Sequence, residues 1–200
     1  MRKLTKEHYR TFLFKSEAKT YPAGLLEVFQ LLFLQCEYIQ AHDYCNGLVI
    51  LLDFDEANIM ETVKAHKVTE LRQVLLILKE GYGMKIKGIH ILSQSRAIDT
   101  LVTLFKQIFS AKLASRIAVH KTTDTLYDYV PKEILPKEYG GNEKTIKEMH
   151  DEFLDILTTK EFSEYMNEIN KATTNEELRV LTDEDKTLGV PGTFRSLNVD

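Results

Sequence analysis

An unbroken apolar run from Leu48 to Leu52, followed at once by Asp53, constrains the fold more than any other part of this 200-residue sequence. A strand with one face in water alternates apolar and polar residues, whereas a strand covered on both faces stays apolar throughout. The run therefore predicts a strand of a parallel sheet that is covered by helices. Ile86 to Leu92 predicts a second buried strand, Ile117 to His120 a short third one, and Arg10 to Phe14 an edge strand.

Segments with helical periodicity separate these strands. A helix is expected over Leu25 to Ala41, and others where apolar residues recur at helical spacing: Val68, Leu71, Val74, Leu75 and Leu78; Ile98, Leu101, Val102, Phe105, Ile108 and Phe109; Ile146, Met149, Phe153, Ile156 and Leu157. Strands that alternate with helices predict an α/β fold with a mostly parallel sheet. We expect one domain over residues 1–170 and a C-terminal tail, residues 171–200, that packs on the domain or extends from it.

Composition excludes several broad classes. Apolar residues make up 44% of the chain and charged residues 28%, which is typical of a globular domain. A net charge of −4 argues against a general nucleic-acid binder. The two cysteines cannot form a disulfide framework and suit a reduced, cytosolic protein. No apolar signal segment follows Met1, and polar residues interrupt the apolar stretch from Leu25 to Ile39, so neither a leader nor a membrane span is expected.

The segment Asp53-Phe54-Asp55 is the one motif that favours an enzyme. Two aspartates at the end of a buried strand are where phosphohydrolases of the haloacid dehalogenase type place a nucleophile and an acid/base. That chemistry also needs a later acidic pair after a core strand to hold Mg²⁺, and no strand pattern precedes Asp183-Glu184-Asp185. The alternative is a solvated acidic loop. His90, within a predicted strand, is interpreted as a hydrogen-bonded core histidine.

The stretch from Lys85 to Gly141 resembles the CRAL-TRIO lipid-binding family. The resemblance is carried by Lys85-Ile86-Lys87-Gly88-Ile89-His90, by Lys112-Leu113-Ala114-Ser115-Arg116-Ile117, and by Leu135-Pro136-Lys137-Glu138-Tyr139-Gly140-Gly141, in the family's order and spacing. It extends from about Tyr9 onward, and Gly189-Val190-Pro191-Gly192 is similar to the tail of arthropod members. The family's glycine after the first buried strand and its Asn-x-Pro after the second are absent. The small helical domain that normally precedes this module is also expected to be missing.

The resemblance implies a cytosolic carrier of one hydrophobic small molecule, without catalysis, metal or cofactor. In the family the sheet is the floor of an apolar pocket, and a mobile helix covers the pocket as a gate. By position, the expected pocket residues are Leu48, Ile50, Leu52, Val74, Ile77, Leu78, Tyr82, Ile86 and Ile89, and the expected gate residues are Ile98, Leu101, Val102 and Phe105. For any one of these residues, ordinary core packing is an equal alternative.

Four cations form a second set with a function implied by the resemblance. Lys85 and Lys87 are two apart on a predicted strand, and Lys112 and Arg116 are four apart on a predicted helix, so each pair shares a face. Basic residues at these positions grip a phosphoinositide headgroup in tocopherol-binding members. The resemblance thus implies transient contact with anionic membrane lipid, where the alternative is a solvated surface.

Three function classes remain open from the sequence. They are a lipid carrier, a phosphohydrolase that uses Asp53 and Asp55, and a scaffold that binds a protein partner without cargo. The identity of the cargo stays open as well, because retinoids, tocopherols, carotenoids and other lipids all suit an apolar cavity with few polar anchors.

Overall fold

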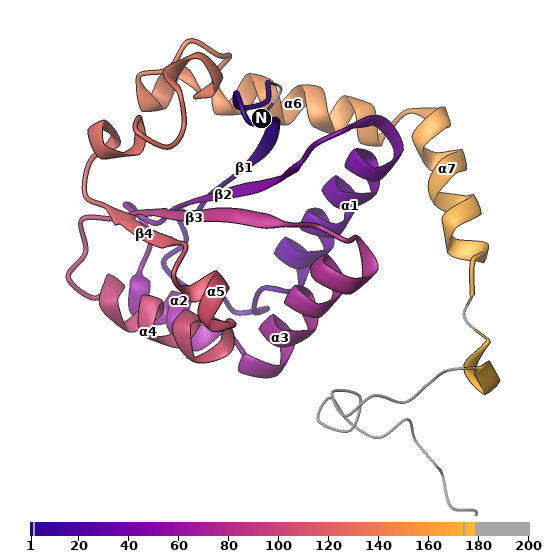
Figure 1. Ribbon diagram of the computed structural model, residues 1–200, viewed down its shortest axis with the longest axis horizontal. Helices are drawn as coiled ribbons and strands as arrows, with labels where there is room; N and C mark the ends of the chain where they lie inside the picture. The colour runs from indigo at the N-terminus through magenta and orange to yellow at the C-terminus, as the bar shows by residue number, and fades with distance from the viewer. Residues whose placement is uncertain (2, 174, 179–200) are drawn as a thin grey trace, which may run out of the picture. The chain divides into compact units, whose positions relative to one another are not determined.

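The computed structural model describes residues 1, 3–173 and 175–178 (Figure 1). The chain divides into two compact units, Met1–His150 and Asp151–Asp200. The first unit contains all the predicted pocket, gate and headgroup residues. The segment from residue 179 onward, which includes most of the expected tail and the Gly189-Val190-Pro191-Gly192 motif, lies outside the described residues.

The described part of the first unit is built on a four-stranded sheet in the order β1-β2-β3-β4. Its strands are β1 (Tyr9–Lys15), β2 (Gly47–Asp53), β3 (Ile86–Leu92) and β4 (Ile117–His120), and all three pairings are parallel. A register shift beside Leu48 and Val49 separates the start of the β2–β3 pairing from the rest. The predicted α/β fold with a parallel sheet is therefore confirmed.

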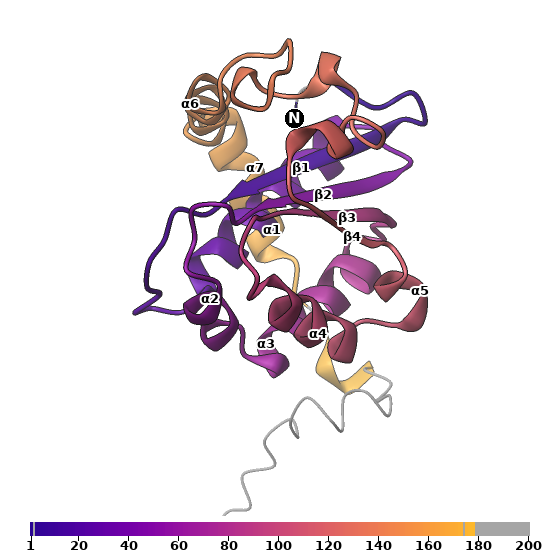
Figure 2. The same ribbon diagram turned by 90° about the vertical axis from the view of Figure 1, so that its left-hand side faces the viewer.

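Helices that connect the strands lie on one face of this sheet (Figure 2). They are α1 (Leu26–His42), α2 (Ile59–Ala65), α3 (Val68–Leu76), α4 (Ile98–Ile108) and α5 (Ala111–Ala114). A single π-helical turn, Ile77–Gly81, continues α3 toward β3. Parallel neighbours need crossover connections, and right-handed crossovers between strands in sequential order place every helix on the same side.

The segment after β4 covers the opposite face of the sheet. It consists of short 3₁₀ turns at Thr123–Leu126, Lys132–Ile134 and Lys137–Tyr139. Its buried residues pack with the β2 residues Val49 and Leu51 in one apolar cluster. Gly141 ends this cover because a Cβ there would lie 2.0 Å from the carbonyl oxygen of Leu135, and Gly140 adopts a left-handed backbone.

Two helices follow the cover segment along the chain. The first, α6 (Ile146–Leu157), begins in the first unit, and its bounds match the apolar periodicity predicted from the sequence. The second, α7 (Lys160–Lys171), belongs to the second unit. Thr159 caps α7 by accepting a hydrogen bond from the backbone N–H of Phe162.

The helices predicted from apolar periodicity agree with the structure, and α2 is a helix that this periodicity did not indicate. It has only seven residues, too few to show a period. The sequence feature that marks the start of α2 is Asn58, whose side chain caps the helix by accepting hydrogen bonds from the backbone N–H groups of Met60 and Glu61. The prediction that one helix holds both Lys112 and Arg116 is wrong, because α5 ends at Ala114 and Arg116 lies in the turn before β4.

Candidate functional site

The helix-side face of the sheet carries a continuous apolar cluster beneath α4. Side chains at alternating positions of a strand point to the same face, so Ile50 and Leu52 meet the helices while Val49 and Leu51 meet the opposite cover. The cluster also contains Phe54 and residues of α2 and α3. It brings together these residues predicted from the sequence: Ile50, Leu52, Ile86, Ile89, Ile98, Leu101, Val102 and Phe105.

The remaining predicted pocket residues lie elsewhere. Val74, Leu78 and Tyr82 pack with residues of α1 around Cys36 in a separate apolar cluster. Leu48 is almost fully buried, with 1% of its surface exposed. Ile77 is 41% exposed at the start of the π-helical turn, so the structure places it at the surface and not among the others.

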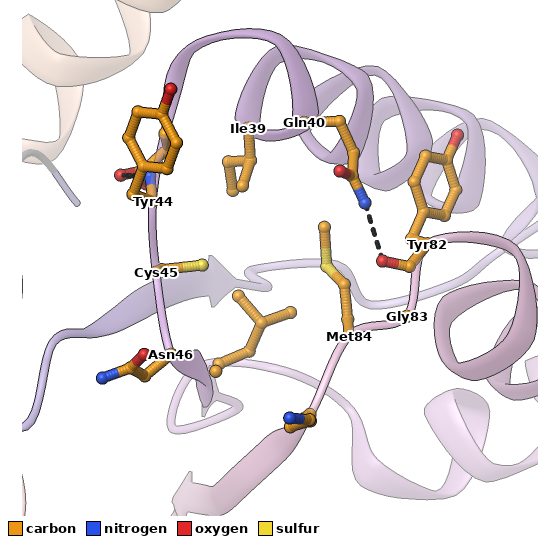
Figure 3. A pocket seen from close by; sticks show the side chains of 12 residues that line it. Ile39, Gln40, Tyr44, Cys45, Asn46, Tyr82, Gly83 and Met84 are labelled. Carbon is orange, nitrogen blue, oxygen red and sulfur yellow. Dashed lines mark hydrogen bonds between the residues drawn. The ribbon is translucent and has the colours of Figure 1, made fainter.

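An open pocket of about 320 Å³ lies at the amino ends of β2 and β3 (Figure 3). Ile39, Leu48 and Met84 form its apolar part, and Cys45 points into it from the loop after α1. Its lining is completed by Gln40, Asp43, Tyr44, Asn46, Gly47, Tyr82, Gly83 and Lys85. Two predicted cargo residues, Leu48 and Tyr82, thus share this pocket with Lys85 of the predicted headgroup set.

Hydrogen bonds hold the polar rim of this pocket. The side-chain Nε2 of Gln40 donates to the backbone oxygen of Tyr82 at 2.7 Å, which ties α1 to the loop before β3. Asp43 forms an ion pair with Arg10 at 2.7 Å, so its charge is compensated. These contacts fix the position of the polar rim in the folded protein.

The four predicted headgroup cations lie around the amino edge of β3 and β4. Lys85 and Lys112 are exposed. The ammonium group of Lys87 lies over the Tyr9 ring, 5.1 Å from its centroid. The Arg116 guanidinium donates to the backbone oxygen of Ile86, so this side chain also links β4 to β3. Two of the four thus already have contacts within the protein.

Asp53 and Asp55 are held by contacts that stabilise the fold. Asp53 is buried, and its carboxylate accepts a hydrogen bond from the Tyr139 hydroxyl at 2.6 Å and another from the backbone N–H of Asp55 at 3.0 Å. Burial and the Asp53 carboxylate raise the pKa of Tyr139, so its hydroxyl stays protonated. The Asp55 carboxylate accepts from the backbone and side chain of Gln94. Tyr139 belongs to the motif that carries the family resemblance, and this contact explains its place there.

His90 and His120 form a buried pair on the opposite face of the sheet. His90 Nδ1 lies 3.0 Å from His120 Nε2, and His120 Nδ1 lies 2.8 Å from the hydroxyl of Thr125. That hydroxyl donates to the backbone oxygen of Thr122 and so accepts from His120. His120 Nε2 must then accept, and His90 Nδ1 must donate. The interpretation of His90 as a hydrogen-bonded core histidine is confirmed.

Burial, together with the neighbouring His120, lowers the pKa of His90 to about 4. Burial also lowers the pKa of His120, and Asp128 opposes that shift. Both rings are therefore neutral near pH 7, as the hydrogen-bond pattern requires.

The described residues contain no helix that is long and apolar enough to cross a membrane. They contain no group of three or more histidine, cysteine, aspartate or glutamate side chains placed to hold a metal ion.

Comparisons with known proteins agree with the geometry. The family model described as CRAL/TRIO domain matches residues 5–141. An alpha-tocopherol transfer protein-like protein of Mus musculus is 31% identical over 97 residues, and its Homo sapiens counterpart is 30% identical over the same length. Each alignment covers 48% of this chain and 28% of the relative, so the match spans less than a third of the relatives' length.

Proposed function

The chain belongs to the CRAL/TRIO domain family, and from that premise we propose that it binds one hydrophobic small molecule between the sheet and α4 and transfers it between membranes. The observation that carries the proposal is the apolar cluster on the helix-side face. It joins β2, β3 and α4 through residues that the resemblance assigns to a pocket and its gate. The names of the relatives in mouse and human support a tocopherol-like lipid as one cargo class.

Burial of apolar area supplies the affinity for such a cargo. Each Å² of apolar surface removed from water contributes roughly 25 cal/mol, so a lipid with several hundred Å² gains many kcal/mol. The cluster is closed over by α4, whose outward residues Thr103, Lys106 and Gln107 are exposed. Entry of cargo therefore requires α4 to move away from the sheet.

The test is to purify the protein from cells, extract it and identify retained lipid by mass spectrometry. Ile89→Trp should then lower the binding of the extracted lipid, because Ile89 is 3% exposed within the cluster and a larger ring fills the same space. Val119→Trp is the matched control, because Val119 is 41% exposed. Absence of any retained lipid would contradict the proposal, and so would equal binding of the extracted lipid by Ile89→Trp and Val119→Trp.

We further propose that the cations at the amino edge of β3 and β4 engage anionic lipid headgroups during release. Each cation near an anionic surface contributes about 1 kcal/mol, an attraction that salt weakens. Lys85 and Lys112 are the residues to reverse, because reversal of Arg116 would also remove its contact with the Ile86 backbone. Lys85→Glu with Lys112→Glu should slow transfer to phosphoinositide vesicles at fixed ionic strength.

The control for this experiment is the pair Lys121→Glu and Lys137→Glu, which makes the same change in net charge at exposed positions of the first unit. Lys121 follows the carboxyl end of β4, and Lys137 begins the turn whose Tyr139 contacts Asp53 at the carboxyl end of β2. Loading of cargo in solution should be unchanged in both double variants. Equal slowing by the two double variants would assign the effect to net charge and not to a headgroup site.

For Asp53 and Asp55, we propose a structural role in place of phosphate chemistry. Their carboxylates already accept hydrogen bonds from Tyr139, from Gln94 and from the backbone of Asp55. Mg²⁺-dependent hydrolysis of a generic phosphate ester that disappears in Asp53→Asn would favour the enzyme instead.

A further inference from the structure

His66 places a polar side chain against the gate helix. It follows α2 directly, and its ring packs edge-on to Phe105 of α4 with the centroids 5.4 Å apart and the planes at 69°. Phe105 is a buried member of the helix-side cluster. His66 thus borders the space in which the proposed cargo lies, at a position that the sequence analysis did not single out.

The protonation of the His66 ring follows from its contacts. His66 Nδ1 lies 2.7 Å from the backbone oxygen of Thr62. A carbonyl oxygen only accepts, so Nδ1 carries the hydrogen. Burial lowers the pKa of His66, which keeps the ring neutral near pH 7. Nε2 is then a bare acceptor on the side of the ring away from Thr62.

Among the described residues, the one hydrogen bond of the His66 ring nitrogens is that of Nδ1 with Thr62. Nε2 has no partner in the described part of the protein and is not among its buried atoms without a partner, so it reaches solvent at the rim of the cluster. The neighbouring cluster consists of hydrocarbon side chains, which bind lipids in proportion to area and distinguish poorly between an alcohol and its derivative. An acceptor that the protein leaves available at the edge of that cluster is the group that can make this distinction.

We propose that His66 Nε2 accepts a hydrogen bond from a hydroxyl group of the cargo, so that the carrier prefers neutral lipids with a hydroxyl donor. This inference rests on the proposed function, because the cargo must lie against α4 to reach His66. A ketone, ether or aldehyde of the same skeleton offers no donor to Nε2. A carboxylate would bring a second acceptor with a charge.

The experiment compares lipids in pairs that differ in this donor. The pairs are retinol with retinaldehyde, α-tocopherol with its methyl ether, and cholesterol with cholest-4-en-3-one. Wild-type protein should bind the hydroxyl member of a pair about tenfold more tightly, the difference that one hydrogen bond of about 1.4 kcal/mol makes. Dissociation constants are measured by fluorescence or by competition with a bound probe lipid.

Two substitutions separate the nitrogens of His66. In His66→Asn, the amide nitrogen can replace Nδ1 at the Thr62 oxygen, but no atom replaces Nε2, so the preference should be lost. In His66→Gln, the longer side chain can place an amide oxygen near the position of Nε2, so much of the preference should return. His42→Asn is the matched control, because His42 Nδ1 makes the same contact with the backbone of Tyr38 on the exposed end of α1.

The outcomes distinguish the inference from the proposed function. Loss of the preference in His66→Asn alone supports the inference. If wild type binds both members of every pair equally, or if His66→Asn keeps the full preference, His66 does not select the cargo. The proposed function as a lipid carrier is not contradicted by either result. If wild type binds no member of any pair and retains no lipid from cells, carriage itself fails and the inference with it.

Discussion

Acidification should destabilise the protein through the buried pair His90 and His120. The perturbation is a change from pH 7 to pH 4. The folded pKa of His90, about 4, lies below its ordinary value of 6.5, so the fold favours the neutral ring. The unfolded chain binds a proton first as the pH falls, and folding stability therefore decreases between pH 6.5 and pH 4 and levels off below that.

The magnitude follows from the size of the pKa shift. A shift of one unit corresponds to 1.36 kcal/mol, so the difference between 6.5 and about 4 is worth at most about 3 kcal/mol. His120 adds to this loss in the same direction, because its pKa is also lowered. That is a large part of the 5–15 kcal/mol that typically stabilises a folded domain.

The assay is urea unfolding at a series of pH values in the wild type and in His90→Asn, whose amide can still donate to His120 but does not titrate in this range. The contributions of other titrating groups to the free energy of unfolding cancel when the value for His90→Asn is subtracted from that for the wild type. Wild type should lose up to about 3 kcal/mol more than the variant between pH 7 and pH 4. His150→Asn, at an exposed position, should follow the wild type. Parallel stability curves for wild type and His90→Asn would refute the reasoning.

Three further outcomes are expected. Tyr139→Phe should cost about 1–3 kcal/mol in urea unfolding, because the buried Asp53 carboxylate loses a donor, and an unchanged midpoint would show that this hydrogen bond adds nothing to stability. Gly141→Ala should cost more than about 1 kcal/mol, because its Cβ would meet the Leu135 carbonyl, and retention of the wild-type melting temperature would contradict that close approach. Hydrogen exchange should show the amides of α4 opening more readily than those of β2, while equal, global protection of both elements would make α4 a fixed core helix.

The apolar runs and helical periods were enough to predict the sheet. The run from Leu48 to Leu52 stays apolar because β2 is covered on both faces, and this is a local property that the sequence records directly. The motif from Leu135 to Gly141 pointed to the family for an equally local reason. Gly140 and Gly141 stand where the backbone turns left-handed and passes within contact of Leu135, which leaves no room for a larger residue.

The composition of the candidate site was only partly predictable. Alternation along β2 placed Ile50 and Leu52 on one face, but both faces of that strand are apolar, so only the resemblance indicated which face meets the helices. Ile77 has the right apolar character for a pocket and yet lies at the surface, because the chain enters a π-helical turn there and changes its period.

Contacts between distant residues were decided by the tertiary structure alone. Tyr139 and Asp53 are 86 residues apart, and His90 and His120 are 30 apart. A period in the sequence sets the face on which a side chain lies, but its partner depends on strand register and on where the cover segment crosses the sheet. His66 is the clearest case. Its sequence context shows a polar residue after a short helix, and only the packing of α2 against α4 places its ring beside Phe105.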